Sequence, residues 1–352
     1  MTLSASAAPS PLPITIPKDL AAGLEDLFVR GTPENTLRAY ERDFAYLSAW
    51  KQATFGSGLE WPEQEQVALR FIVDHARDLS DATEGDPAHA AALELVGLGL
   101  RRSLKPPAPS TLDRRIASWR AFHRMRNLDN PFDAPLVRSA RQKARRAARH
   151  RPMRKSKHAV TRDILNELLA TCGNDLRSVR DAAVLVLAWA SGGRRRSEVA
   201  ALRREDIDLD AYDETGVIWL HLIETKTTQG GETPKLVLKG RAAAIVHRWI
   251  VDAEIEDGPL FRAVSKSDRP LPRRLSADGV RHVLKTRLVA AGYPPDFASP
   301  HGLRSGFLTQ AALDGAPIQA AMRLSLHRSV KQAMAYYDDV EITDNPATEL
   351  LG

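Results

Sequence analysis

The chain of 352 residues contains a single cysteine, Cys172, no long apolar run and no leader-like N-terminus. One cysteine excludes an internal disulfide and a cysteine-rich zinc site, and it is consistent with a reducing cytoplasm. We predict no metal site and no cofactor. The most apolar stretches, AAALELVGLGL and AAVLVLAWA, are too short to span a bilayer. The N-terminal MTLSASAAPSPLPITIPKD lacks the basic and apolar regions of a secretory signal. We therefore expect no membrane partner.

What the sequence does contain is apolar residues for sizeable cores and an excess of positive charge. Its hydrophobic content is 43%, and its formal net charge is +6 with a pI of about 9.5. This length and composition suffice for two globular domains. The charge favours a polyanionic partner such as nucleic acid, although charge alone decides neither the fold nor the chemistry.

Apolar residues recur with helical spacing through the first half of the chain. Leu37, Tyr40 and Phe44, for example, share one face of a predicted helix. The pattern predicts four amphipathic helices, the third beginning at a Ser110 cap. They span residues 36–50, 64–75, 110–125 and 135–149. The stretch 79–109 mixes acidic, Ala/Leu-rich and Pro-rich pieces, and its structure stays open.

The segment from Arg138 to Lys157 is rich in Lys and Arg and contains no acid. Its first half can be helical, and its second half, broken at Pro152, has the composition of an extended connector. Because like charges repel one another, the segment is either a solvated linker or one that follows nucleic acid phosphates. In the second case the candidate DNA-binding residues are Arg138, Arg141, Lys143, Arg145, Arg146, Arg149, Arg154 and Lys155.

From Thr161, a candidate helix cap, helical segments flank a short stretch of strands. The predicted helix 177–190 ends in the apolar run AAVLVLAWA and must therefore be buried. GVIWLHLIETK and PKLVLKG have strand character and flank the turn TTQGGE, which predicts a small antiparallel sheet. Further helices are predicted at 241–252, 276–291 and 300–314, followed by one that carries two tyrosines. The fold class is therefore mainly α with a small antiparallel β-sheet.

Charged residues interrupt this apolar pattern at WASGGRRRSEVAAL. Arg195 and Glu198 lie three positions apart, so the carboxylate can fix the direction of the guanidinium group. Three consecutive arginines are by themselves more typical of a solvated surface run. Their place directly after a buried helix and a Gly-Gly bend argues against that alternative.

A second group of polar residues follows in ASPHGLRSGF, where Ser299 is a candidate helix cap and His301 and Arg304 share one helical face. The first turn of a helix attracts a phosphate, and an imidazole and a guanidinium group strengthen that preference. Lys226 ends a predicted strand, where a hairpin tip can carry it into a cleft, and His327 precedes the last helix. For each of these residues the ordinary alternative is a surface position.

Two adjacent tyrosines occur in LSLHRSVKQAMAYYDDV. Ser329 followed by Gln332 forms a capping-box pattern, so a helix should start at residue 330 and carry Tyr336 and Tyr337 in its second turn. Neighbouring residues on a helix point about 100° apart. At most one of the two tyrosines can therefore face a site.

The order and spacing of these polar residues resemble the tyrosine recombinase (phage integrase) family from Thr161 to the C-terminus. The residues that carry the resemblance are Arg195, Glu198, Lys226, His301, Arg304, His327 and Tyr336. In that family the nucleophilic tyrosine follows the second histidine by nine positions, which selects Tyr336 over Tyr337. Upstream, TPENTLRAYERDFAYLSAW and STLDRRIASWRAFHR resemble the helical core-binding domain of the same enzymes.

The resemblance implies a domain organisation, and the sequence departs from the family pattern at two positions. The implied parts are a tail at 1–18, a helical core-binding (DNA-binding) domain at 19–149, a basic linker at 150–160, and an α+β catalytic domain at 161–352 with a short C-terminal tail. Leu326 stands where the family usually has glycine, and Ser305 where a further histidine is common. Neither change removes a catalytic group, and the first bears on the backbone around His327.

The resemblance also implies a mechanism, in which DNA strands are broken and rejoined through a 3′-phosphotyrosyl link. The implied roles are nucleophile for Tyr336, contacts to the non-bridging oxygens for Arg195 and Arg304, general acid for Lys226, transfer of the tyrosine proton for His301, a hydrogen bond to phosphate for His327, and support of Arg195 by Glu198.

The implied partner is double-stranded DNA, bound by a homotetramer on paired sites, in a bacterial-type, nucleoid-associated protein of a mobile element. A monomer in free solution stays open, as does the choice between a C-terminal tail that docks on a neighbouring protomer and one that frays. Two other functions are weighed against recombination. Intact catalytic groups argue against a regulator that binds DNA without cutting it. The helical N-terminal domain and the short tail argue against a type IB topoisomerase-like enzyme.

Overall fold

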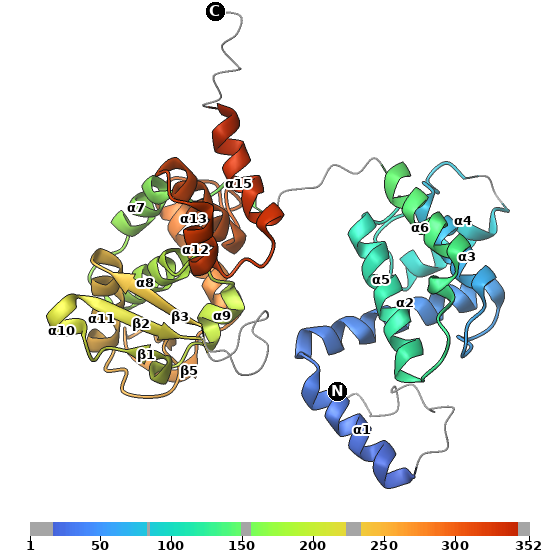
Figure 1. Cartoon of the computed structure of the whole chain (residues 1–352), viewed down its shortest axis with the longest axis horizontal. Coiled ribbons are helices and arrows are strands. Elements are labelled where there is room, and N and C mark those ends of the chain that lie inside the picture. The colour runs from blue at the N-terminus through green and yellow to red at the C-terminus, as the bar shows by residue number, and fades with distance from the viewer. Residues whose placement is uncertain (1–16, 83–84, 149–155, 223–233, 344–352) are drawn as a thin grey trace, which may run out of the picture. The chain divides into compact units, whose positions relative to one another are not determined.

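The computed structural model of the chain describes residues 17–82, 85–148, 156–222 and 234–343. The chain divides into two compact units, Met1–Pro152 and Met153–Gly352 (Figure 1). Both units are mostly helical, and the second contains two small antiparallel sheets. The predicted fold class, mainly α with a small antiparallel sheet, is confirmed.

The first unit is a bundle of helices around an aromatic core. Its helices are α1 (Lys18–Gly31), α2 (Glu34–Phe55), α3 (Glu65–Ala76), α4 (Pro87–Gly97), α5 (Pro109–Met125) and α6 (Pro135–Ala147). Trp50 of α2 packs edge-on against Phe71 of α3 and Trp119 of α5, with ring centroids 4.9 and 6.1 Å apart. All three side chains are fully buried, so the apolar stripes of these helices hold the bundle together.

The four helices predicted for this unit form, and two more join them. The predicted Ser110 cap was wrong, because α5 begins at Pro109 after Ala108. Helix α4 lies in the stretch that was left open, and the Asp86 carboxylate caps it by accepting from the backbone N of Ala88 at 2.9 Å. Helix α1 was not predicted, and it begins at the end of the expected tail.

Helix α8 (Leu176–Ala190) forms the centre of the second unit, and α11, α12 and α13 pack against it. The helices of this unit also include α7 (Arg162–Ala170), α9 (Arg196–Ala201), α10 (Tyr212–Thr215), α11 (Arg241–Asp252), α12 (Ala277–Ala290), α13 (Pro300–Leu313), α14 (Ile318–Ser325) and α15 (Val330–Thr343). Leu185 and Leu187 of α8 are fully buried, as its apolar sequence requires. Within the described ranges, no helix combines the length and the apolarity of a membrane span.

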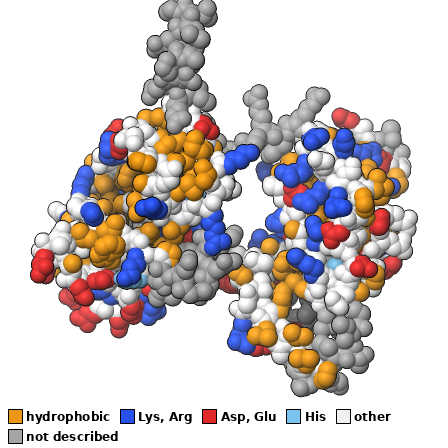
Figure 2. Space-filling model, viewed as in Figure 1, with side chains coloured by type: hydrophobic (Ala, Val, Ile, Leu, Met, Phe, Trp, Pro, Cys, Tyr) orange, Lys and Arg blue, Asp and Glu red, His pale blue; other side chains and the backbone are white. Residues whose placement is uncertain are grey.

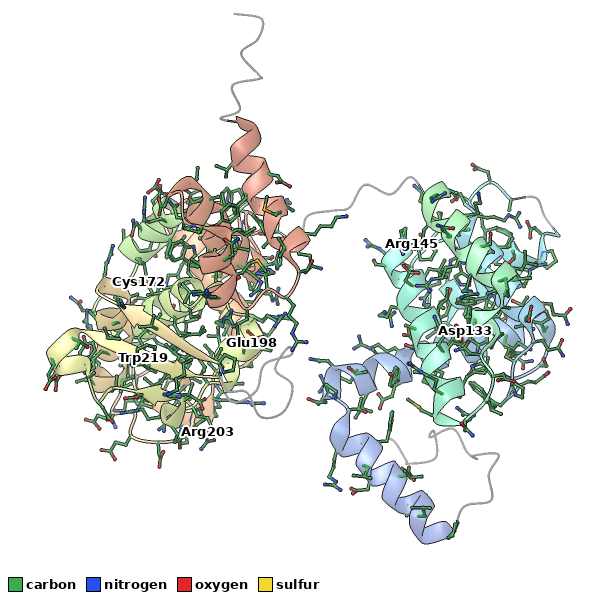
Figure 3. The ribbon with its side chains drawn as sticks, in the orientation of Figure 1. Asp133, Arg145, Cys172, Glu198, Arg203 and Trp219 are labelled. Atoms are coloured by element: carbon green, nitrogen blue, oxygen red, sulfur yellow. The ribbon has the colours of Figure 1, made fainter. Side chains whose placement is uncertain are left out.

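The larger sheet of this unit has the strand order β1 (Ile207–Asp208), β2 (Val217–His221), β3 (Lys235–Lys239), and every pair is antiparallel. Trp219, labelled in Figure 3, faces outward opposite Val237, while the alternate residues of β2 are buried. A second pair consists of β4 (Arg262–Val264) and β5 (Pro270–Arg274). The predicted TTQGGE turn between β2 and β3 falls in 223–233, outside the described residues.

A segment at residues 156–160, which we call the strap, lies along α13. The backbone N of Val160 donates to the carbonyl of Gly302 at 2.8 Å, and the indole of Trp189 donates to the Val160 carbonyl at 2.8 Å. A Cβ atom at Gly306 would lie 1.8 Å from that carbonyl oxygen, so only glycine permits this approach. The strap therefore positions the first two turns of α13.

Candidate active site

Tyr336 and Tyr337 lie in the second turn of α15 and point in different directions. Tyr337 is buried, and its hydroxyl donates to the carbonyl of Ala316 at 3.0 Å. Tyr336 is half-buried, and its hydroxyl oxygen lies 3.2 Å from Nε2 of His301 on α13. Of the two neighbours, Tyr336 is therefore the one whose hydroxyl meets a predicted site residue.

The first turns of α13 supply an imidazole and a guanidinium group on one face. Ser299 caps the helix, because its Oγ accepts from the backbone N of His301 at 3.3 Å. Arg304 is buried, and its Nη1 donates to the carbonyl of Gly193 at 3.0 Å. Burial, followed by the positive charge of Arg195, lowers the pKa of Arg304. Arg304 is thus a cation that the fold holds partly out of water.

His327 lies against this guanidinium group. Nε and Nη2 of Arg304 are 3.3 and 3.1 Å from Nε2 and Nδ1 of the ring, and Oγ of Ser325 is 2.7 Å from Nδ1. Burial, followed by the charges of Arg304, Arg194 and Arg195, lowers the pKa of His327 to about 4. The ring is therefore neutral at neutral pH and has one acceptor nitrogen. Nε of Arg304 donates to Nε2, so Nε2 is the acceptor nitrogen of the ring.

Arg195 is the N-cap residue of α9, and Glu198, labelled in Figure 3, holds it twice. The carboxylate accepts from the backbone N of Arg195 at 3.2 Å and from its Nη1 at 2.5 Å. The side chain of Arg195 is 37% exposed and that of Arg196 46%, whereas that of Arg194 is only 1% exposed. The three arginines are therefore not a uniform surface run, and the carboxylate gives Arg195 a fixed direction with an open face.

These side chains come from four places in the chain: the start of α9, the first turns of α13, the turn after α14, and α15. Tyr336 contacts His301, Arg304 contacts His327, and the charge of Arg195 acts on both Arg304 and His327. The cluster combines a phenol, a neutral imidazole and guanidinium groups, a set that can hold an anion beside a nucleophile. Among the described residues, no group of three or more His, Cys, Asp or Glu side chains could hold a metal ion.

Residues 158–341 match the model of the phage integrase family. The chain belongs to this family. It is 25% identical over 320 residues to the integrase/recombinase xerD homolog of Selenomonas ruminantium, an alignment that covers 88% of this chain and 83% of the relative. It is 26% identical over 326 residues to tyrosine recombinase XerD of Xanthomonas campestris pv. campestris, covering 87% and 83%.

A solved structure of the Tn1549 transposon integrase, in complex with transposon right end DNA, has a similar fold. Its TM-score to this chain is 0.55 at 16% sequence identity, and the match covers 89% of this chain and 92% of that one. At this identity the likeness concerns the fold alone.

Four of the predicted site residues lie outside the described residues. Lys226 falls in 223–233, and Arg149, Arg154 and Lys155 fall in 149–155. Their roles as general acid and as DNA contacts therefore stay predictions.

Lys157 of the basic segment lies in the second unit and pairs with Asp296. The other described cations of the segment lie on α6 in the first unit, where Figure 2 shows Lys and Arg side chains gathered at the surface. They are Arg138, Arg141, Lys143, Arg145 and Arg146. With Arg120, the four arginines line a surface hollow of about 610 Å³. Nε of Arg141 lies 2.7 Å and Nε of Arg145 3.5 Å from the Asp113 carboxylate. Part of the charge on α6 is therefore neutralised within the unit.

Sequence reasoning missed three groups that surround Arg304 and His327. They are the carbonyl of Gly193, the hydroxyl of Ser325 and the buried guanidinium group of Arg194. The Gly-Gly bend was a signal for the first, because such a bend brings backbone close to another element. The other two depend on contacts between distant segments, for which no local pattern exists.

Proposed function

We propose that this chain is a site-specific DNA recombinase that cleaves and rejoins strands through a 3′-phosphotyrosyl intermediate on Tyr336. The observation that supports this most directly is the place of the Tyr336 hydroxyl, 3.2 Å from Nε2 of His301. His301 shares the first turns of α13 with Arg304, which contacts His327 in turn. A nucleophile, a proton acceptor and two phosphate ligands are thus within reach of one another.

In the proposed reaction the phenol oxygen of Tyr336 attacks phosphorus while the bond to the 5′-oxygen breaks, so the energy of the phosphodiester is kept in the new ester. His301 accepts the phenol proton through Nε2. Arg195 and Arg304 bind the non-bridging oxygens, whose negative charge grows in the pentacoordinate transition state. Lys226 protonates the departing 5′-oxygen, a role that rests on the family resemblance. Attack by a 5′-hydroxyl of another strand reverses these steps and completes strand exchange.

The proposed partner is double-stranded DNA, contacted by both units. The DNA in the Tn1549 integrase complex and the basic surface of α6 both support this partner. Phosphate contacts supply most of the affinity for DNA, whereas base contacts choose the site. The proposal includes a homotetramer on paired sites, because strand exchange needs two cleaved duplexes side by side.

The test is to trap the covalent adduct. The protein is incubated with a library of nicked genomic duplexes, in which cleavage next to a nick releases a short strand and prevents rejoining. We expect a protein–DNA adduct that resists denaturant and is absent with Tyr336→Phe, and sequencing the attached strand identifies the site. No adduct, or an adduct that persists in Tyr336→Phe, would refute the proposal. Exchange between two copies of the site, in place of relaxation of a supercoiled plasmid, distinguishes recombination from topoisomerase activity.

A further inference from the structure

Arg194 is the most deeply buried member of the arginine run. Its whole residue is 2% exposed, and the α8–α9 loop that carries it passes close to the end of α14. A Cβ atom at Gly192 would lie 2.3 Å from the carbonyl of Leu324, so only glycine allows the loop to approach this far. Arg194 therefore lies where two segments about 130 positions apart in the sequence meet.

The guanidinium group of Arg194 bridges these two segments. Its Nη2 donates to the carbonyl of Leu324 at 2.9 Å, and its Nη1 lies 3.7 Å from Oε2 of Glu198. The Leu324 carbonyl belongs to the last turn of α14, where carbonyls lack partners within the helix and a cation is favourable. Arg194 thus caps α14 and, through the same group, attracts one oxygen of Glu198.

Both ends of this bridge lead to the candidate active site. The other oxygen of Glu198 binds Nη1 of Arg195. Beyond Leu324, the hydroxyl of Ser325 contacts His327. The buried side chain of Arg194 therefore constrains the direction of Arg195 and the turn that carries His327, both of which are proposed phosphate ligands.

Stability alone does not call for arginine at this position. Burial, followed by the charges of Arg304 and Arg195, lowers the pKa of Arg194 to about 10 although the charge of Glu198 acts in the opposite direction, so the charge of Arg194 is held at a cost. In the described part of the chain, no group accepts a hydrogen bond from its Nε. Removing one partner of a buried ion pair destabilises a protein when it leaves the other charge unpaired, but Glu198 would keep Arg195 as its partner. The charge of Arg194 and its hydrogen bond to Leu324 therefore point to a role other than packing.

We propose that Arg194 is a positioning residue for the proposed cleavage reaction. By bridging Glu198 and the C-terminus of α14, it holds Arg195 and His327 in place around the phosphate. The inference rests on the proposed function, because its effect is read in adduct formation.

The bridge also has an electrostatic consequence at His327. The charged and titratable groups around this ring are Arg304 and His301 from α13, Arg194 and Arg195 from the α8–α9 loop, and Tyr336 from α15, whose ring centroid lies 6.5 Å away. Removing the charge of Arg194 takes away one of the cations that lower the pKa of His327. Without that charge, the ring of His327 would bind a proton at a higher pH than in the parent protein. Protonation of Nε2 would break the contact in which Nε2 accepts from Arg304.

The experiment compares Arg194→Met, Arg194→Lys and a control, Arg203→Met, in the full chain. Arg203 is an exposed arginine paired with Glu205, so the control removes one charge away from the site. The probe is the nicked duplex recovered by the trapping experiment. Single-turnover adduct formation is measured against DNA concentration and pH, and the thermal midpoint of each variant is recorded.

We expect Arg194→Met to slow adduct formation about 10- to 100-fold with less than about a threefold change in the half-saturating DNA concentration. Its acid limb should move to higher pH. Arg194→Lys should keep the pH profile while recovering only part of the rate, because it retains the charge but not the two-ended bridge. Arg203→Met should match the parent protein in both readouts.

A parent-like rate and pH profile in Arg194→Met would overturn the inference, as would an Arg194→Lys variant that equals Arg194→Met in both. If Arg194→Met does not fold, Arg194→Lys and Glu198→Gln carry the test. Slow adduct formation by both, with normal thermal midpoints, supports the bridge, and parent-like rates in both refute it. A parent protein that forms no adduct refutes the proposed function itself, which keeps the two failures distinguishable.

Discussion

Removing the Tyr337 hydroxyl should reduce stability and leave DNA cleavage intact. The hydroxyl donates to the carbonyl of Ala316 at 3.0 Å, and the whole residue is 6% exposed. Phenylalanine fills the same space but leaves that carbonyl without its donor, which costs about 1 kcal/mol. For a cooperative unit of about 200 residues, this corresponds to a thermal midpoint lower by about 2–4 °C.

The neighbouring tyrosine is the matched control for this prediction. Tyr336→Phe removes the same atom from the preceding residue of α15, where the side chain is half-buried and water can replace the lost contact. We therefore expect a nearly unchanged thermal midpoint and no covalent adduct for Tyr336→Phe, and the opposite for Tyr337→Phe. Midpoints come from circular dichroism, and adduct yields are measured well below both midpoints. A Tyr337→Phe variant that keeps its midpoint but forms no adduct would contradict the assignment of the two residues.

Three further predictions concern packing, pH and salt. Gly306→Ala should destabilise the second unit by about 3 kcal/mol or more, because its Cβ would overlap the strap. In the control Gly173→Ala, the nearest atom to the new Cβ is 3.4 Å away, so the thermal midpoint should change little. Equal midpoints for the two variants would contradict this packing. Burial lowers the pKa of His75 from 6.5 to about 3 in the folded chain. As the pH falls below 6.5, the unfolded chain therefore binds a proton that the folded chain does not, and the free energy of unfolding decreases, by about 2 kcal/mol at pH 5. His75→Gln should flatten that loss in denaturant titrations of the full chain at several pH values. Arg138→Gln should lower the salt slope of DNA binding by about 1. Because Nε of Arg141 contacts Asp113, Arg141→Gln should lower the salt slope less and should also reduce the thermal midpoint. Unchanged salt slopes in both variants would indicate that the basic segment is only a spacer.

Elements with strong local signals could be predicted from the sequence. Helix α11 has the predicted bounds, and α8 begins one residue before its predicted start, because apolar periodicity determines both. Helix α4 was missed although Asp86 and Pro87 form a start signal, since its short apolar run lies between acidic and Pro-rich pieces. Helix α9 has six residues, fewer than two turns, and periodicity cannot identify it.

In the candidate site, too, features that depend on local sequence could be predicted, whereas features that depend on contacts between distant segments could not. The separation of Tyr336 from Tyr337 follows from helix geometry, which is local, and the structure places the two side chains as that geometry requires. The burial of Arg194 depends on the contact between α14 and a distant loop. From the sequence alone, the three arginines could therefore be interpreted either as a surface run or as part of a site.

Leu326 shows how a departure from a family pattern can be absorbed. Its φ is 52° and its ψ 40°, the left-handed conformation that glycine adopts readily and leucine does not. The side chain packs against the main core of the second unit, which offsets part of the strain. The backbone before His327 therefore has the turn that glycine would give, and the change affects stability more than geometry.

The cluster around the proposed phosphate contains more positive than negative charge. Arg194 and Arg195 share the single carboxylate of Glu198, and Arg304 lies buried beside them. Burial and the charges of the neighbouring arginines lower the pKa of Arg194 and of Arg304, so the free protein keeps its cations at a cost in stability. An anion bound among them would relieve that cost, and in the proposed reaction the phosphorane, which carries more charge than the phosphodiester, would relieve it further. Strain in the unbound site would in this way become preference for the transition state over the substrate.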